Sequence, residues 1–147
     1  MDSLKIETVE YQDYMVMINQ IRTKVFQEEQ GVAAELEFDG LDPSATHFLA
    51  YINGQAIATA RIREIDGDTI KIERLAVLPD YRKQGIGKHL MRSALSTITQ
   101  RGKSLAIVHA QAYIAQLYQQ LGFEIVGEQF NEAGIPHVKM IKMTKQL

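Results

Sequence analysis

Apolar side chains recur along this chain with two different periods, which predict its strands and helices. Repeats of three to four residues predict helices at residues 13–26, 86–101 and 114–121. Alternating or short continuous apolar runs predict strands at residues 4–9, 47–52, 55–64, 69–78, 104–109, 123–126 and 138–143. This order of elements predicts an α/β (α+β) domain built on a mixed sheet.

Glycine, proline and acidic residues mark the connections between these elements. Asn53-Gly54 predicts a tight hairpin and Asp66-Gly67-Asp68 a second turn, whereas residues 131–136 are expected to form a loop. The longest connection, residues 27–43, is acidic and irregular, with one short helix expected near residues 33–36. Its apolar residues can dock on the domain, so we expect this connection to be functional rather than disordered.

Length and composition predict one globular domain over residues 1–147. The chain has 147 residues, a net charge of −2 and no cysteine, which excludes a disulfide framework, a thiolate nucleophile and a cysteine-based zinc site. The histidines are scattered, so no metal is expected. Without a signal-peptide pattern, a long apolar run or a basic surplus, we expect a cytoplasmic protein that binds neither membranes nor nucleic acid.

Charge is distributed unevenly along the chain. Residues 25–60 contain six acidic residues and no Lys or Arg, whereas residues 71–103 contain eight basic residues and two acidic ones. One half is therefore suited to receive a cation and the other an anion. Two solvated faces with a chance bias would give the same pattern.

Residues 75–88 combine a strand end, a turn and a helix start. Pro79 stops the apolar run, and Gly85 and Gly87 stand where the next helix begins. The start of a helix exposes unpaired N–H groups and partial positive charge, and glycine allows an anion to approach the backbone closely. The segment therefore predicts a site for a phosphate or diphosphate group.

Two widespread phosphate motifs do not fit this segment. A P-loop requires Ser or Thr where His89 stands, and the dinucleotide fingerprint requires a third glycine where Leu90 stands. The segment instead resembles the acetyl-CoA-binding motif of the GNAT superfamily of N-acetyltransferases, on the pattern Val77-x-Pro79-x-x-Arg82-x-x-Gly85-x-Gly87.

Two further segments are similar to the same superfamily, so the resemblance covers most of the chain. Its second signature is resembled by Ala112, Ala115, Tyr118 and Leu121-Gly122-Phe123, with Gln111 where the family has Asn. The ElaA-like branch is resembled by Arg22-x-x-x-Phe26-x-x-Glu29-Gln30-Gly31 and Ala45-x-His47.

The resemblance implies a single-domain GNAT-type acyl-CoA N-acyltransferase fold, with a mostly antiparallel sheet of about six to seven strands. It implies acetyl transfer from acetyl-CoA to a primary amine, without a metal and by direct attack on the thioester. The strand end would pair with the pantetheine arm and the loop would hold the diphosphate. The cofactor-binding residues would be Leu75, Ala76, Val77, Arg82, Lys83, Gln84, Gly85, Ile86, Gly87, Lys88 and Gln111.

The resemblance also implies catalytic roles. Tyr118 matches the general acid that protonates the thiolate of coenzyme A, although its helical period alone would place it in the core. Glu73 matches the general base, although it is equally consistent with a solvent-facing strand residue. His47, His109 and a water molecule remain alternative bases.

The acceptor, a small-molecule or peptide amine, is expected over the acidic segment, with Arg22, Glu29 and Gln30 as contacts. Arg22 could instead pair with Glu28 or Glu29 as a structural ion pair. An alternative function is a non-catalytic acyl-CoA-binding or sensing module, and a third is a plain interaction domain. The sequence leaves open a monomer or a homodimer.

Overall fold

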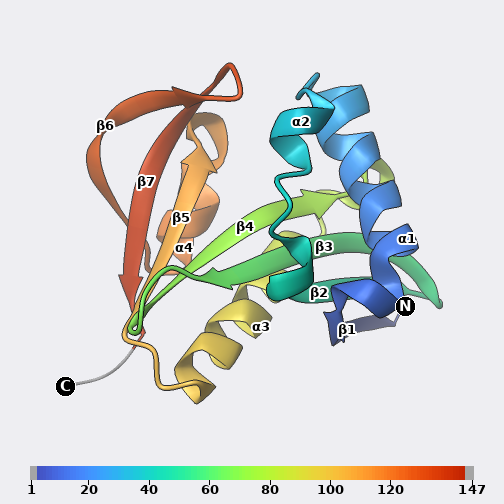
Figure 1. Cartoon of the computed structure of the whole chain (residues 1–147), viewed down its shortest axis with the longest axis horizontal. Coiled ribbons are helices and arrows are strands. Elements are labelled where there is room, and N and C mark those ends of the chain that lie inside the picture. Colours follow the sequence, from blue (N-terminus) through green and yellow to red (C-terminus); the bar gives the residue numbers. More distant parts are fainter. Residues whose placement is uncertain (1–2, 145–147) are drawn as a thin grey trace.

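The computed structural model describes residues 3–144, which form one seven-stranded sheet with helices on both faces (Figure 1). The strands lie in the order β1-β2-β3-β4-β5-β7-β6. They are β1 (Leu4–Glu10), β2 (Thr46–Ile52), β3 (Gln55–Glu64), β4 (Thr69–Val77), β5 (Leu105–Gln111), β6 (Glu124–Glu132) and β7 (Ile135–Met143). Among the described strand pairs only β4–β5 is parallel, which confirms a mixed and mostly antiparallel sheet.

The helices connect these strands. They are α1 (Tyr11–Arg22), α2 (Ala34–Glu37), α3 (Ile86–Gln100) and α4 (Ala115–Gln120), with 3₁₀ turns η2 (Asp42–Ser44), η3 (Pro79–Tyr81) and η4 (Ala112–Ile114). The first predicted helix is present, but its last third is a π-helix, η1 (Thr23–Glu29). The Gln30 N–H there donates to the Val25 carbonyl five residues back, at 3.1 Å. An apolar period over so few residues does not distinguish this winding from an α-helix.

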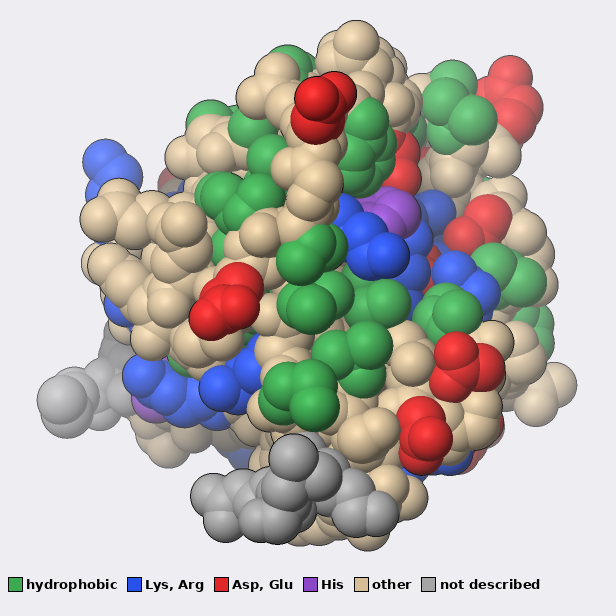
Figure 2. All heavy atoms as spheres, turned by 90° about the vertical axis from the view of Figure 1, so that its left-hand side faces the viewer, with side chains coloured by type: hydrophobic (Ala, Val, Ile, Leu, Met, Phe, Trp, Pro, Cys, Tyr) green, Lys and Arg blue, Asp and Glu red, His purple; other side chains and the backbone are tan. Residues whose placement is uncertain are grey.

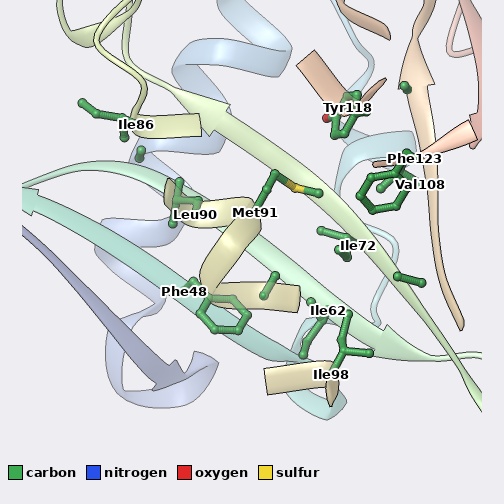
Figure 3. Packing of buried hydrophobic residues seen from close by; sticks show 14 of the residues in the cluster. Phe48, Ile62, Ile72, Ile86, Leu90, Met91, Ile98, Val108, Tyr118 and Phe123 are labelled. Carbon is green, nitrogen blue, oxygen red and sulfur yellow. The ribbon is translucent and has the colours of Figure 1, made fainter. Parts of the chain in front are cut away.

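Two apolar clusters hold the helices against the sheet. On one face, α3 buries Leu90 and Met91 against Phe48, Ile62 and Ile72 of the sheet (Figure 3). On the other face, α1 and η1 form a second buried cluster with the sheet, made of Val9, Ile18, Ile21, Val25, Leu49 and Ala76. Burying each large side chain of this kind contributes about 1.5–3 kcal/mol before entropy is counted. The sheet is therefore a rigid platform for whatever its two faces carry.

Strands β4 and β5 pair over only part of their length. The parallel ladder joins residues 69–72 to residues 105–108, and its last pair is Ile72–Val108. Beyond this point the two strands diverge, as Figure 1 shows. Arg74 has a positive φ of 56°, and the β3–β4 register shifts beside it. This bulge bends the second half of β4 away from β5.

The last two strands are longer than their sequence predicted. Residues 131–136 do not form a loop, because Glu132 and Ile135 are paired and only Ala133 and Gly134 turn, with φ of 52° and 76°. Pro136 suggested a loop because it lacks an N–H group. It lies just before the first β5–β7 pair, Gln111–His137, so no bond to β5 is lost. The extended hairpin brings the side chain of Glu132 to His109 of β5.

Candidate active site

The divergence of β4 and β5 opens a cleft of about 1010 Å³, lined from η1, β4, the loop before α3, β5, α4 and the β6–β7 turn. Most residues predicted for the site line it: Gln30, Glu73, Leu75, Ala76, Val77, Arg82, Lys83, Gly85, Ile86, Gly87, Lys88, Gln111 and Tyr118. Arg22, Glu29 and Gln84 do not line it. Segments that are distant in the sequence therefore meet around one cavity.

The N-terminus of α3 faces this cleft without a cap. Lys83 and Gly85 adopt left-handed backbone with φ of 63° and 79°, which turns the chain sharply into the helix at Ile86. Gly85 at the N-cap has no side chain, and among residues 3–144 no side-chain hydrogen bond caps the start of the helix. A 15-residue helix carries partial positive charge at this end, and unpaired N–H groups there suit an anion. The geometry suits an anionic group.

The second half of β4 leaves one edge open toward the cleft. The Leu78 N–H donates to the Ile57 carbonyl of β3 at 3.0 Å. Because successive N–H groups of an extended strand point in opposite directions, the Val77 N–H points toward the cleft. The Val77 carbonyl accepts a hydrogen bond from Arg82 Nε at 2.9 Å. An extended molecule can therefore pair with this edge as a further strand would.

Tyr118 lies on α4 at the wall of the same cleft. Its ring is buried and meets Phe123 edge-on, with 6.0 Å between ring centroids (Figure 3). Burial raises the pKa of the Tyr118 hydroxyl well above its ordinary value. The phenol therefore stays protonated near neutral pH and is available as a proton donor. Tyr118 therefore belongs to the core, as its helical period indicates, and also lines the cleft.

Gln111 and Gln30 bridge the cleft from opposite walls. Gln111 Nε2 donates to Gln30 Oε1 at 3.0 Å, and Gln30 Nε2 donates to Gln111 Oε1 at 3.4 Å. Gln111 is the last residue of β5, and Gln30 is the first residue after η1. Gln30, predicted as an acceptor contact, is thus positioned at the cleft by an amide pair.

Glu73 is held in an ion-pair network and is not a free carboxylate. One oxygen accepts from Arg61 Nη2, and the other accepts from Arg63 Nε at 2.8 Å. Its side chain is only 6% exposed. Burial opposes the negative charge, but Arg61, Lys71 and Arg63 outweigh it and lower the pKa of the carboxyl.

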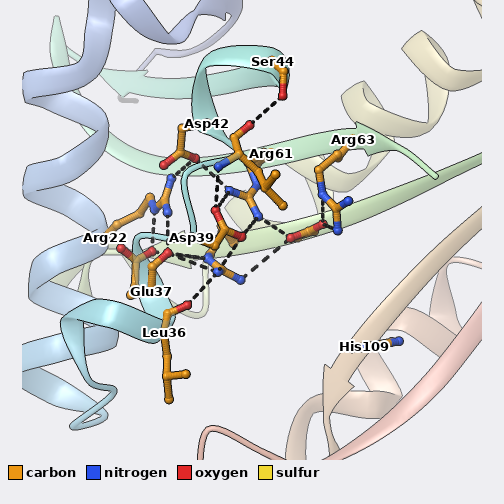
Figure 4. Close-up of polar contacts among 12 residues, drawn as sticks. Arg22, Leu36, Glu37, Asp39, Asp42, Ser44, Arg61, Arg63 and His109 are labelled. Atoms are coloured by element: carbon orange, nitrogen blue, oxygen red, sulfur yellow. Dashed lines mark hydrogen bonds and ion pairs between the residues drawn. The ribbon is translucent and has the colours of Figure 1, made fainter.

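The acidic segment is partly neutralised from within the protein (Figure 4), which corrects the expectation that Arg22 contacts an acceptor or pairs with its neighbours in sequence. Arg22 is completely buried and donates to Glu37 and to Asp42, each at 2.6 Å, rather than pairing with Glu28 or Glu29. Its guanidinium is therefore not exposed to an acceptor. Further ion pairs in this network are Arg61–Asp39, Arg61–Asp42, Arg74–Glu37 and Arg74–Asp39. Four of the six carboxylates of this segment, Glu29, Glu37, Asp39 and Asp42, therefore already have arginine partners.

Two histidines were alternative bases, and their surroundings differ. His47 is completely buried, with Nε2 3.0 Å from the Asp42 carbonyl oxygen, and burial lowers its pKa. His109 lines the cleft, with Nδ1 3.1 Å from Glu132 Oε1. Sequence reasoning missed Glu132 because residues 131–136 were assigned to a loop. The alternation of Phe130, Glu132, Ile135 and His137 around Ala133-Gly134 was the available signal.

Charged and apolar side chains share the surface on the side of β6 and β7. Figure 2 shows Lys and Arg side chains gathered beside a histidine, next to a band of hydrophobic side chains.

In the described part of the chain, no helix is both long and apolar enough to cross a membrane.

Known proteins are similar to this chain in sequence and in architecture. A family model described as an acetyltransferase (GNAT) domain matches residues 7–144. YyaT, an uncharacterized protein of Bacillus subtilis, is 40% identical over 125 residues, covering 83% of this chain and 84% of YyaT. ElaA of Escherichia coli is 33% identical over 127 residues, covering 84% of this chain and 83% of ElaA.

Solved structures agree with this match. The crystal structure of Escherichia coli ElaA superposes with a TM-score of 0.84 at 28% identity, covering 95% of this chain and 99% of ElaA. An acyl-CoA N-acyltransferase from Pseudomonas aeruginosa gives a TM-score of 0.82 at 30% identity, with coverage of 95% and 99%. The family match extends over nearly the whole sheet and both walls of the cleft. The chain belongs to the GNAT acetyltransferase family.

Proposed function

We propose that this protein is an N-acetyltransferase that transfers the acetyl group of acetyl-CoA to a primary amine by direct attack on the thioester. The observation that carries the proposal is that three features meet in one cleft: the uncapped start of α3, the open edge of β4 and the buried hydroxyl-bearing Tyr118. Each suits a different part of acetyl-CoA: the diphosphate, the pantetheine arm and the departing sulfur.

The donor half of the site is assigned to backbone groups. The N–H groups of residues 83–88 bind the diphosphate, and Lys83 and Lys88 add positive charge. The edge of residues 75–77 pairs with the pantetheine arm. The Val77 N–H then donates to the thioester carbonyl oxygen and stabilises the negative charge that develops on it.

Transfer requires one bond to form and one to break. The neutral amine attacks the carbonyl carbon, the C–N bond forms, and the C–S bond breaks with its electron pair on sulfur. Tyr118 donates its hydroxyl proton to that sulfur and takes back the proton released by the new amide nitrogen. The chain has no cysteine to carry an acetyl group, which favours direct attack over a covalent enzyme intermediate.

The first experiment tests the donor site by calorimetry with coenzyme A. Gly85→Ala and Gly102→Ala make a matched pair, because both glycines have φ above 70° and neither added Cβ meets an atom within 4 Å. Both variants lose about 1–2 kcal/mol of stability to backbone strain. Only Gly85→Ala is expected to weaken coenzyme A binding, because only Gly85 lines the cleft. Equal binding by both variants contradicts the proposed diphosphate site.

The second experiment measures thiol release from acetyl-CoA with a panel of primary amines. Turnover with any amine supports the transferase. Coenzyme A binding without turnover across the panel favours the alternative, a non-catalytic acyl-CoA-binding or sensing module. The substitution of Gln111 for the family's Asn, with its amide paired to Gln30, is the feature consistent with that alternative.

A further inference from the structure

His109 and Glu73 occupy matching positions on the two strands at the point where the cleft begins. The last β4–β5 pair is Ile72–Val108, so Glu73 and His109 are the first residues beyond the parallel ladder. Both line the cleft. Figure 4 shows His109 on a different strand from Arg61 and Arg63, the two arginines that donate to Glu73. Each of the two strands therefore contributes one titratable side chain where the cleft begins.

Glu73 is poorly suited to remove a proton from an amine. Both of its oxygens already accept charge-assisted bonds from arginine side chains. Protonation would break one of these bonds while both arginines remain charged. The same partners lower the pKa of the carboxyl, which makes it a weaker proton acceptor.

His109 has the complementary arrangement. Its Nδ1 lies 3.1 Å from Glu132 Oε1, and its side chain is 26% exposed in the cleft. Because an ionised carboxylate only accepts hydrogen bonds, Nδ1 carries the ring proton, and the neutral ring keeps a lone pair on Nε2. The ring also makes a T-shaped contact with the ring of Phe130, with 5.2 Å between centroids, which restrains its orientation further. The imidazole is oriented as a base, with its free nitrogen unpaired among the described residues.

We propose that His109 is the general base that deprotonates the acceptor amine, and that Glu132 is its positioning residue. This inference rests on the proposed N-acetyltransferase function. The acceptor ammonium gives one proton to His109 Nε2 and becomes the neutral amine that attacks the thioester. The resulting imidazolium is stabilised by Glu132 and later returns its proton to solvent. Glu73 instead keeps Arg61 and Arg63 in place on the opposite wall.

Other charged groups face His109 from each neighbouring strand. Lys139 of β7 is its cross-strand partner, and His137 of β7 approaches the second oxygen of Glu132 at 3.6 Å. His137 Nδ1 lies 2.7 Å from the Ile135 carbonyl oxygen, so its ring is held by the turn. Lys71 of β4 lines the cleft beside Glu73. Among these groups, Glu132 is the carboxylate that lies at Nδ1 of His109.

The test compares pH profiles of kcat/KM for an amine that the wild-type protein acetylates. His109→Asn keeps a donor in the place of Nδ1 but removes the base, so we expect a loss of at least about 100-fold at pH 7. Activity should recover at high pH, where solvent deprotonates the amine. Glu132→Gln should lose about tenfold and move the acidic limb to lower pH, because the imidazolium loses its counter-charge. Glu73→Gln should keep the acidic limb of the wild type.

Controls separate this inference from loss of folding or of the donor site. His89→Asn alters an exposed histidine on α3 outside the cleft and should match the wild type. Calorimetry should give the same acetyl-CoA affinity for His109→Asn and wild type. If the wild-type protein acetylates an amine and His109→Asn shows the same turnover and the same pH profile, the role of His109 is overturned and the proposed function is not. A wild-type protein that transfers to no amine overturns the inference together with the proposed function.

Discussion

Arg82 and Glu29 are joined by a pair of short hydrogen bonds, from Nη1 to Oε2 at 2.5 Å and from Nη2 to Oε1 at 2.6 Å. Arg82 also holds the Val77 carbonyl through Nε. One guanidinium thus connects the end of η1, the end of β4 and the loop that leads to α3. Its planar fork fixes the geometry of all three segments relative to one another.

Removal of this guanidinium should weaken acetyl-CoA binding more than it weakens the fold. The pair is more than a third exposed on each side, so Arg82→Ala should change the free energy of unfolding by about 1 kcal/mol or less. Loss of the anchor on Val77 and of a cation beside the loop should raise the dissociation constant of coenzyme A about tenfold, or about 1.4 kcal/mol. Calorimetry and urea unfolding measure the two effects. Glu29→Gln removes a nearby negative charge and should not weaken binding; an unchanged affinity in Arg82→Ala would exclude the anchoring role.

Tyr118→Phe should lower turnover by at least tenfold and leave the KM for acetyl-CoA nearly unchanged. The hydroxyl is the proposed proton donor to sulfur, whereas the ring that packs on Phe123 is retained. Because burial raises the pKa of Tyr118, a basic limb caused by its ionisation should lie above about pH 10, the ordinary value of a tyrosine. Thiol release against pH measures both effects. Wild-type turnover in the variant would remove Tyr118 from the mechanism.

The parts of the site that are local in the sequence were predictable. The strand end, the turn and the helix start fall within residues 75–88, and each is fixed by residues that neighbour it, such as Pro79 and Gly85. The family match at Tyr118 also follows from local spacing. The order of the strands in the sheet and the opening of the cleft beyond Ile72 depend on which strands pair, and no local pattern predicts that pairing.

The buried ion pairs and the contact between His109 and Glu132 were not predictable either, because they also depend on how distant segments come together. Arg22 finds Glu37 and Asp42 only after α2 and η2 fold back on α1, so its expected partners were those nearest in sequence. His109 meets Glu132 only because the β6–β7 hairpin is longer than Pro136 suggested. A residue type and its spacing indicate chemistry, but the partner that directs the chemistry comes from another segment.

Arg22→Met should destabilise the fold strongly. Methionine fills much of the volume but leaves the buried Glu37 and Asp42 without one of their cations. Removing one partner of a buried ion pair costs about 3–5 kcal/mol, because the remaining charge is desolvated. Urea unfolding measures the loss, and Arg92→Met on the exposed face of α3 is the control, with about 0.5 kcal/mol or less expected. The double variant Arg22→Met with Glu37→Gln should recover part of the loss; no recovery would place the cost in packing rather than in charge.

Stability should fall in acid because the same network holds its carboxylates ionised. Burial opposes the charge of Asp42, but Arg22 and Arg61 outweigh it and lower its pKa, as arginines also do for Glu73. A carboxylate with a lowered folded-state pKa contributes stability that is complete above the unfolded value, near pH 4, and is lost as pH falls through the folded value.

Burial lowers the pKa of His47, so the unfolded chain binds a proton there first and an earlier, smaller decline begins below about pH 6.5. The free energy of unfolding in urea should therefore be level from about pH 7 to 8, decrease slightly toward pH 5 and drop steeply below about pH 4. Asp42→Asn should be less stable at pH 7 and show a shallower drop, and equal stability of the wild type at pH 7 and pH 3 would contradict the role assigned to these arginines.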